Sequence, residues 1–187
     1  MFPDHTPESA PPAARPTMAA TARQFGMIPS AVARLATSPE TLNGFLKLNA
    51  IFETTTLSAL ERETLVMTVA TRNGCHLCVA MHTGTLHSLS APEAVVTALR
   101  AQSSLPDPRL DALRTFTLTV MDTTGDVPPD ALDAFMAAGF TPRNALEVVL
   151  GIGTYTLSTF ANRLTGAPVD EPFAAHAWSP ETVGAHR

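Results

Sequence analysis

The sequence has few cysteines, few basic residues and no long hydrophobic run, and each shortage excludes a class of protein. Only two of the 187 residues are cysteines, which rules out a fold held together by several disulfides. No run approaches the ~18 apolar residues of a membrane-spanning helix. Lysine and arginine number 12 against 17 acidic residues, the net charge is −5, and no basic cluster occurs. The charge therefore argues against binding to nucleic acid or to an anionic membrane.

Charged residues of both signs are also scarce. They make up 16% of the chain, whereas hydrophobic residues make up 45%, and the mean hydropathy is slightly positive at +0.12. A chain of this length is sufficient for one domain with a substantial core. The low charge indicates a homo-oligomer, in which other subunits cover some helix faces. A monomer surface rich in alanine and threonine is the alternative explanation.

The composition divides the chain into three parts. Residues 1–16 contain five prolines and no apolar core of a signal peptide, so we expect an extended or disordered tail. Residues 17–165 have the pattern of one helical domain. Residues 166–187 lose that periodicity but keep Phe173 and Trp178, and we expect this tail to pack on the domain or on a neighbouring subunit. The lack of an export signal predicts a cytoplasmic, reducing location.

Helix start and stop signals predict an all-α fold of about eight helices. Few stretches alternate with a period of two residues, and none is followed by a hairpin turn. The expected helix starts share a capping residue, a proline at the first position or a first-turn acid: Ser38–Glu40, Ser58–Glu61, Ser90–Glu93, Asp107–Pro108, Pro128–Asp130 and Thr141–Pro142. The short links between these segments favour a helical bundle.

The two cysteines stand close together, and a histidine follows them at helical spacing. Cys75, Cys78 and His82 are separated by three and four residues, so on a helix they form one stripe. Asn73-Gly74 predicts a reversal just before them, which places Cys75 in the first turn of a new helix. A helix N-terminus stabilises a thiolate and lowers a cysteine pKa from ~8.5 toward 7 or below.

Glu63 is the expected partner of this stripe. It lies on an otherwise apolar line of the preceding helix, where a carboxylate is costly unless it is paired. If the two helices pack antiparallel across the reversal, Glu63 lies level with His82. This geometry predicts a relay from Glu63 through His82 to a cysteine.

Three readings of this cluster remain open. A cysteine peroxidase needs a low-pKa thiol, a base and a second thiol within one turn, and it requires no metal or organic cofactor. A metal site would use Cys75, Cys78 and His82, with Glu63 or His76 as the fourth ligand. Two core cysteines beside a hydrogen-bonded histidine would be purely structural.

The spacing E-x11-C-x-x-C-x3-H resembles the AhpD-like, or carboxymuconolactone decarboxylase, superfamily, whose redox-active members carry the CxxC pair. The segments FGMIPSAVARLATSPETLNGFLKLNAIF upstream and FANRLTGAPVDEPFAAHAW downstream are similar to the flanks of alkylhydroperoxidase-like members. The resemblance covers most of residues 17–180. It implies a helical AhpD-like fold, assembly as a trimer or hexamer, and reduction of the disulfide by a lipoyl-bearing or other dithiol partner.

The resemblance also implies a role for each residue of the motif. Cys78 is the thiol that attacks a hydroperoxide, Cys75 is the resolving thiol, His82 is the base that acts on Cys78, and Glu63 is the proton relay. The decarboxylases of the superfamily lack the CxxC pair, so a lyase or another non-redox member is the alternative.

One position departs from the pattern of AhpD. AhpD has a further histidine immediately before the second cysteine, whereas this chain has Leu77 there and His76 one place earlier. One residue turns a helix by ~100°, so His76 is only a possible supporting residue. Farther along, Tyr155, Asn162 and Arg163 belong to the last long helix, and the sequence leaves open whether they face the core or a subunit boundary.

Overall fold

Helices make up the regular structure of residues 1–179, the part of the chain described by this computed structural model. No β-strand occurs among these residues, so the all-α prediction is confirmed. There are nine α-helices and a final 3₁₀ helix, slightly more than expected. In chain order the elements are α1 (Arg15–Phe25), α2 (Ser30–Leu35), α3 (Pro39–Phe52), α4 (Ala59–Arg72), α5 (His76–Ser88), α6 (Glu93–Arg100), α7 (Pro108–Asp122), α8 (Pro129–Ala137), α9 (Pro142–Thr165) and η1 (Glu171–His176).

Side-chain caps fix where most of the longer helices begin. The Ser58 side chain accepts a hydrogen bond from the backbone of Glu61, and the Glu61 carboxylate accepts one from the Ser58 N–H, which completes the predicted capping box of α4. The sequence also predicts a capping box from Ser90 to Glu93 at the start of α6, and this prediction is wrong. Ser90 adopts a left-handed φ of 56° and ends α5, and Pro92 precedes α6 without a side-chain cap.

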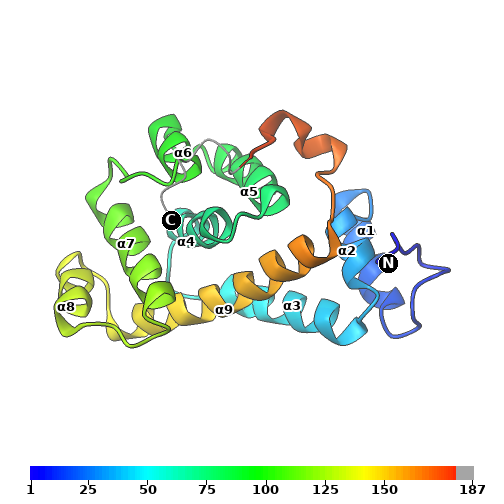
Figure 1. Ribbon diagram of the computed structural model, residues 1–187, viewed down its shortest axis with the longest axis horizontal. Helices are drawn as coiled ribbons and strands as arrows, with labels where there is room; N and C mark the ends of the chain where they lie inside the picture. The colour runs from blue at the N-terminus through cyan, green and yellow to red at the C-terminus, as the bar shows by residue number, and fades with distance from the viewer. Residues whose placement is uncertain (180–187) are drawn as a thin grey trace.

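Helix α4 lies in the middle of the molecule, with α5, α7 and α9 packed around it (Figure 1). The long helix α9 runs along α3, while α6, α7 and α8 form one end and α1 and α2 the other. Every residue of α4 from Glu63 to Thr71 is buried. The helix that carries Glu63 is therefore inside the protein, and its polar groups need partners there.

The first fourteen residues pack on their own chain. Asp4 forms an ion pair of 2.7 Å with Arg34 of α2, and Ala10 and Ala14 are buried in an apolar cluster with Met18 of α1. This segment contains turns, whereas the sequence predicts an extended or disordered tail. Its two alanines share this cluster with Val32 and Leu35 of α2 and Leu42 of α3.

The segment after α9 folds back across α5 and α6. Element η1 lies along α5, and the Trp178 indole N–H donates a hydrogen bond of 3.0 Å to the Arg100 carbonyl. The Arg100 guanidinium donates in turn to the carbonyls of His176 and Ala177. The tail thus contacts its own domain, and its last eight residues, 180–187, lie outside the described part. None of the described helices is long and apolar enough to cross a membrane.

Candidate active site

The reversal between α4 and α5 brings the motif together. Gly74 has a φ of +65°, which a residue with a side chain rarely adopts. The Gly74 N–H donates to the Thr71 carbonyl and the Cys75 N–H donates to the Ala70 carbonyl, the paired bonds of a Schellman motif. Helix α5 begins at once, with Cys75 as its N-cap. The Asn73-Gly74 pair therefore places Cys75 at the positive end of α5.

The two cysteines are free thiols in direct contact. Their Sγ atoms lie 2.7 Å apart, and the Cys78 backbone N–H points at the Cys75 sulfur at 3.4 Å. Both residues are buried, with exposed fractions of 1% for Cys75 and 3% for Cys78. The pair is thus close enough for the two sulfurs to exchange a proton or to form an intramolecular bond.

The negative charge of this dithiol is favoured on Cys75. The hydrogen bond shared with the Cys78 side chain lowers the pKa of Cys75 against the opposing effect of burial. The Cys78 backbone N–H and the positive charges of His82 and Arg163 lower it further. The pKa of Cys78 is raised, because of the hydrogen bond shared with Cys75 and because Cys78 is buried. Of the two thiols, Cys75 is therefore the one that more readily carries a negative charge.

Glu63 and His82 form an ion pair across α4 and α5. Glu63 Oε2 lies 2.8 Å from His82 Nδ1, at the level that antiparallel packing across the reversal implies. Burial lowers the pKa of His82, but the Glu63 carboxylate more than offsets this effect, so the net direction is upward. Because Glu63 holds Nδ1, the other ring nitrogen is left to exchange protons.

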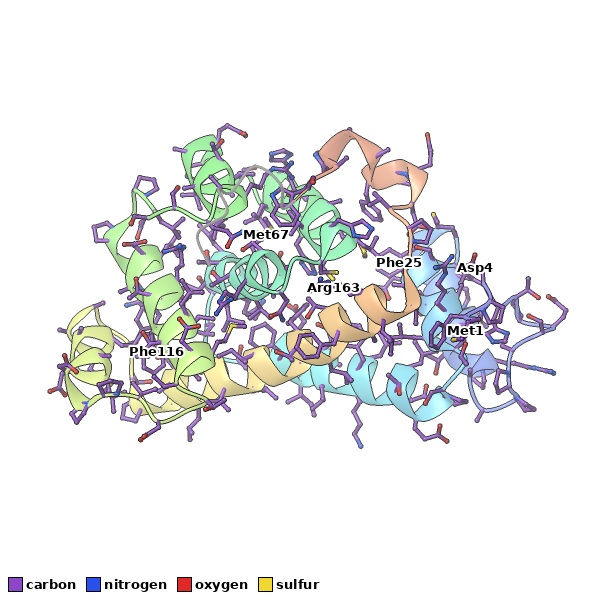
Figure 2. All side chains as sticks on the ribbon, in the orientation of Figure 1. Met1, Asp4, Phe25, Met67, Phe116 and Arg163 are labelled. Atoms are coloured by element: carbon purple, nitrogen blue, oxygen red, sulfur yellow. The ribbon has the colours of Figure 1, made fainter. Side chains whose placement is uncertain are left out.

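Helix α9 supplies the third side of the site. Asn162 Nδ2 lies 3.3 Å from the Cys78 sulfur, and the Tyr155 ring meets the His82 ring edge to face at 5.3 Å. Arg163 donates to the Asn73 carbonyl, and Figure 2 shows it between α9 and the start of α5. The sequence leaves the orientation of these three residues open. Their spacing on α9 is the only sequence signal, and it does not identify the helix that they face.

His76 stands apart from the cluster. It is the first residue of α5 and is partly exposed, and within residues 1–179 its side chain makes no hydrogen bond or ion pair. The structure therefore brings Cys75, Cys78, His82 and Glu63 together without His76. The same described residues contain no group of three or more histidine, cysteine or acidic side chains arranged to hold a metal ion. The geometry thus gives no support to the alternative of a metal site.

This architecture is found in solved structures. An uncharacterised peroxidase-related protein from Ralstonia eutropha, described as an alkylhydroperoxidase AhpD core, superposes with a TM-score of 0.81 at 21% identity, over 92% of this chain and 93% of that one. This chain has the AhpD-like fold. A second peroxidase-related protein, from a Silicibacter species, has a TM-score of 0.76 at 19% identity, over 92% of this chain and 91% of its own.

The AhpD-like fold also occurs in a different kind of enzyme. A debrominase in complex with 2,3,4-tribromopyrrole is similar with a TM-score of 0.73 at 12% identity, over 94% of this chain and 95% of that one. No family model matches the sequence, and no curated protein is similar to it. These similarities establish the fold, and the function has to be argued from the site.

Proposed function

We propose that this protein is a member of the AhpD-like superfamily that reduces organic hydroperoxides with the Cys75–Cys78 dithiol. One observation supports this function above all: two free thiols in contact lie on the same helix stripe as a histidine that a buried carboxylate holds in place. A thiol peroxidase needs these groups and no organic cofactor.

In the proposed first step, Cys78 attacks the hydroperoxide. The resting thiolate on Cys75 first takes the Cys78 proton, which crosses only the 2.7 Å between the sulfurs. The Cys78 thiolate then bonds to the terminal oxygen, the O–O bond breaks, and the alkoxide leaves with a proton from protonated His82. The products are an alcohol and a sulfenic acid on Cys78. The upward shift of the His82 pKa favours the protonated ring that this step requires.

In the second step the two cysteines close a disulfide. The Cys75 sulfur attacks the Cys78 sulfenic acid, hydroxide leaves, and the Cys75 thiol proton passes through His82 to form water. Two electrons from an external dithiol, such as a lipoyl group, then restore both thiols. We expect this cycle to take place in a homo-oligomer, a trimer or a hexamer, in the cytoplasm.

The paired cysteines favour this chemistry over a lyase of the same superfamily. A decarboxylase needs no second thiol within one helical turn, whereas disulfide formation requires one. The debrominase with the AhpD-like fold shows that the fold alone does not select the reaction. A test of the proposal must therefore measure both the oxidation of the thiols and the consumption of the hydroperoxide.

Single-thiol variants test the proposal and the two roles. Cys75→Ser should still react once with an organic hydroperoxide and stop at a sulfenic acid that a dimedone-type reagent traps on Cys78. With dihydrolipoamide as reductant, Cys78→Ser should consume hydroperoxide at least about a hundredfold more slowly than the wild-type protein, since the nucleophile is removed.

The double variant Cys75→Ser with Cys78→Ser is the matched background, and its rate measures chemistry outside the site. Wild-type protein that consumes hydroperoxide no faster than this double variant would remove the peroxidase proposal. A sulfenic acid that forms in Cys78→Ser and not in Cys75→Ser would instead reverse the roles of the two thiols.

A further inference from the structure

Asn162 brings a side-chain hydrogen-bond donor of α9 to the Cys78 sulfur, and Ser158 of the same helix lies beside it. Its Nδ2 atom donates to Cys78 Sγ at 3.3 Å and to Ser158 Oγ at 3.5 Å. The side chain is 4% exposed, and these two bonds account for both hydrogens of the amide nitrogen. These two bonds hold the amide in place beside Cys78, the cysteine whose charged form is the less favoured of the two.

The other end of the same amide has no partner. Within residues 1–179, Asn162 Oδ1 is the one buried side-chain oxygen or nitrogen atom without a hydrogen bond. A buried carbonyl oxygen that lacks a donor costs free energy, so such an atom in a native protein requires an explanation. It shares one carbon atom with the nitrogen that contacts Cys78, so it lies beside the reacting sulfur.

We infer that Asn162 is a catalytic residue that serves both reactants of the proposed first step. Its amide N–H donates to the Cys78 thiolate, and its carbonyl oxygen accepts the O–H of the hydroperoxide. One rigid planar group then holds the nucleophile and the terminal oxygen at neighbouring positions. This inference rests on the proposed function, because it names the group that orients the substrate in that site.

The assignment explains how the less acidic thiol can be the attacking one. The resting charge is favoured on Cys75 at the start of α5, and Cys78 gains charge only when its proton moves to Cys75. At that moment the protonated Cys75 can donate to the Cys78 sulfur, and the Asn162 N–H adds a donor from α9. Hydrogen bonds to a thiolate favour its charged form.

The hydroperoxide supplies the hydrogen-bond donor that Asn162 Oδ1 lacks. Its terminal oxygen carries the one hydrogen that an acceptor can bind, and that oxygen is also the atom that sulfur attacks. When the sulfur–oxygen bond forms and the O–O bond breaks, the alkoxide leaves with a proton from His82, and the hydroxyl hydrogen stays on the new sulfenic acid. The contact with Asn162 Oδ1 therefore persists through the step, while an electrophile without an O–H group gains nothing from it.

A pair of reagents separates orientation of the substrate from activation of the thiol. In a Cys75→Ser background, which leaves Cys78 as the only thiol, cumene hydroperoxide measures both effects, whereas methyl iodide alkylates the thiolate and has no hydrogen-bond donor. Asn162→Ala should slow the reaction with hydroperoxide at least about tenfold more than the alkylation, since it also removes the acceptor. Asn43→Ala, on the surface between α1 and α3, is the matched control and should change neither rate.

Asn162→Leu provides a second variant of similar volume if the alanine variant fails to fold, as judged by circular dichroism. Equal slowing of both reactions in the variants, or no slowing, would overturn the role of Asn162 in orienting the substrate. Failure of the proposed function gives a different result: Cys75→Ser with Asn162 intact would be alkylated but would form no sulfenic acid with the hydroperoxide.

Discussion

At the scale of single residues, the site offers two places for one negative charge. The N-terminus of α5 and the contact with Cys78 favour the charge on Cys75, while a charge on Cys78 is favoured by the contact with Asn162 of α9. The dithiol can thus remain charged at rest and still present its charge to a substrate at the second sulfur. Both demands of a peroxidase cycle, a low pKa and a nearby resolving thiol, are satisfied within one helical turn.

The Glu63–His82 pair gives a prediction with a defined pH dependence. The carboxylate raises the folded-state pKa of His82, so the pair stabilises the protein fully below about pH 6.5, the usual histidine pKa, and loses this effect as pH rises through the raised value. Glu63→Gln should lower the pKa of His82, followed by NMR, and should reduce the free energy of unfolding more at pH 6 than at pH 9.

Glu93→Gln is the matched control, because Glu93 pairs with His87 at the exposed end of α5. It should leave the titration of His82 unchanged. Glu63→Gln should also slow oxidation by hydroperoxide by roughly tenfold or more, since a smaller fraction of His82 is then protonated to assist the leaving alkoxide. An unchanged His82 titration in Glu63→Gln would contradict the ion pair as the cause of the shift.

Local spacing was enough to predict that Cys75, Cys78, His82 and Glu63 lie close together, but not that Asn162 joins them. Cys75, Cys78 and His82 lie within two helical turns, and Glu63 is reached across a single reversal. Asn162 contacts Cys78 from 84 positions away, so its place depends on how α9 packs against α5. No pattern within one helix contains that information, because it is a property of tertiary packing.

At the scale of elements, the close approach of α9 to α4 and α3 depends on one glycine. A Cβ atom on Gly151 would lie 2.7 Å from Leu65 Cδ2 and from Phe52 Cε2, both in the core, whereas a Cβ on Gly153 would meet nothing within 4 Å. Both glycines lie inside the same helix. They therefore separate the effect of packing from the effect of helix propensity.

Gly153→Ala should raise the free energy of unfolding by about 0.5–1 kcal/mol, the ordinary gain of alanine over glycine in a helix. Gly151→Ala gains the same amount but overpacks the core, which costs about 1–3 kcal/mol. Urea denaturation should therefore find Gly151→Ala less stable than Gly153→Ala by about 1–3 kcal/mol. Equal stability of the two variants would show that Leu65 and Phe52 give way without cost.

The helix boundaries show which local signals are reliable. Ser38, Ser58, Asp107 and Thr141 cap the helices that they were expected to cap, since a short polar side chain reaches free N–H groups of its own first turn. Ser90 has the same sequence signature but occupies the left-handed turn that ends α5. The signature does not distinguish the end of one helix from the start of the next when the link is only four residues long.

At the scale of the whole molecule, the outer face of α9 is left apolar. Leu146, Val149, Phe160 and Leu164 are between 50% and 75% exposed. At 100° per residue these four side chains point within about 60° of each other around the helix. A monomer rarely exposes such a continuous apolar stripe, so we predict that a second copy of the chain covers it in the homo-oligomer.

Light scattering after size exclusion tests this prediction. Wild-type protein should elute with a multiple of the 19.8 kDa chain mass, and Phe160→Glu should shift it toward the monomer, because it would bury a charge in the interface. Leu132→Glu on α8 is the control, since Leu132 is also exposed but lies away from the stripe. Monomeric wild-type protein would contradict the prediction.

The two tails show where sequence analysis reaches its limit at this scale. Five prolines among the first sixteen residues favour an extended segment, yet Ala10 and Ala14 are buried against α1, α2 and α3. The burial depends on a complementary surface formed by helices that follow later in the chain. The aromatic residue Trp178 was a better signal, because a large apolar ring with one N–H needs both packing and an acceptor.

Thiol counting by intact mass tests the central proposal most directly. Fully reduced protein is treated with one equivalent of an organic hydroperoxide, and an alkylating reagent then labels the remaining thiols. We predict that both thiols disappear together and that the mass falls by two hydrogens, with peptide mapping that links Cys75 to Cys78. Two thiols that remain free and alkylatable after the treatment would contradict the proposal that this site reduces hydroperoxides.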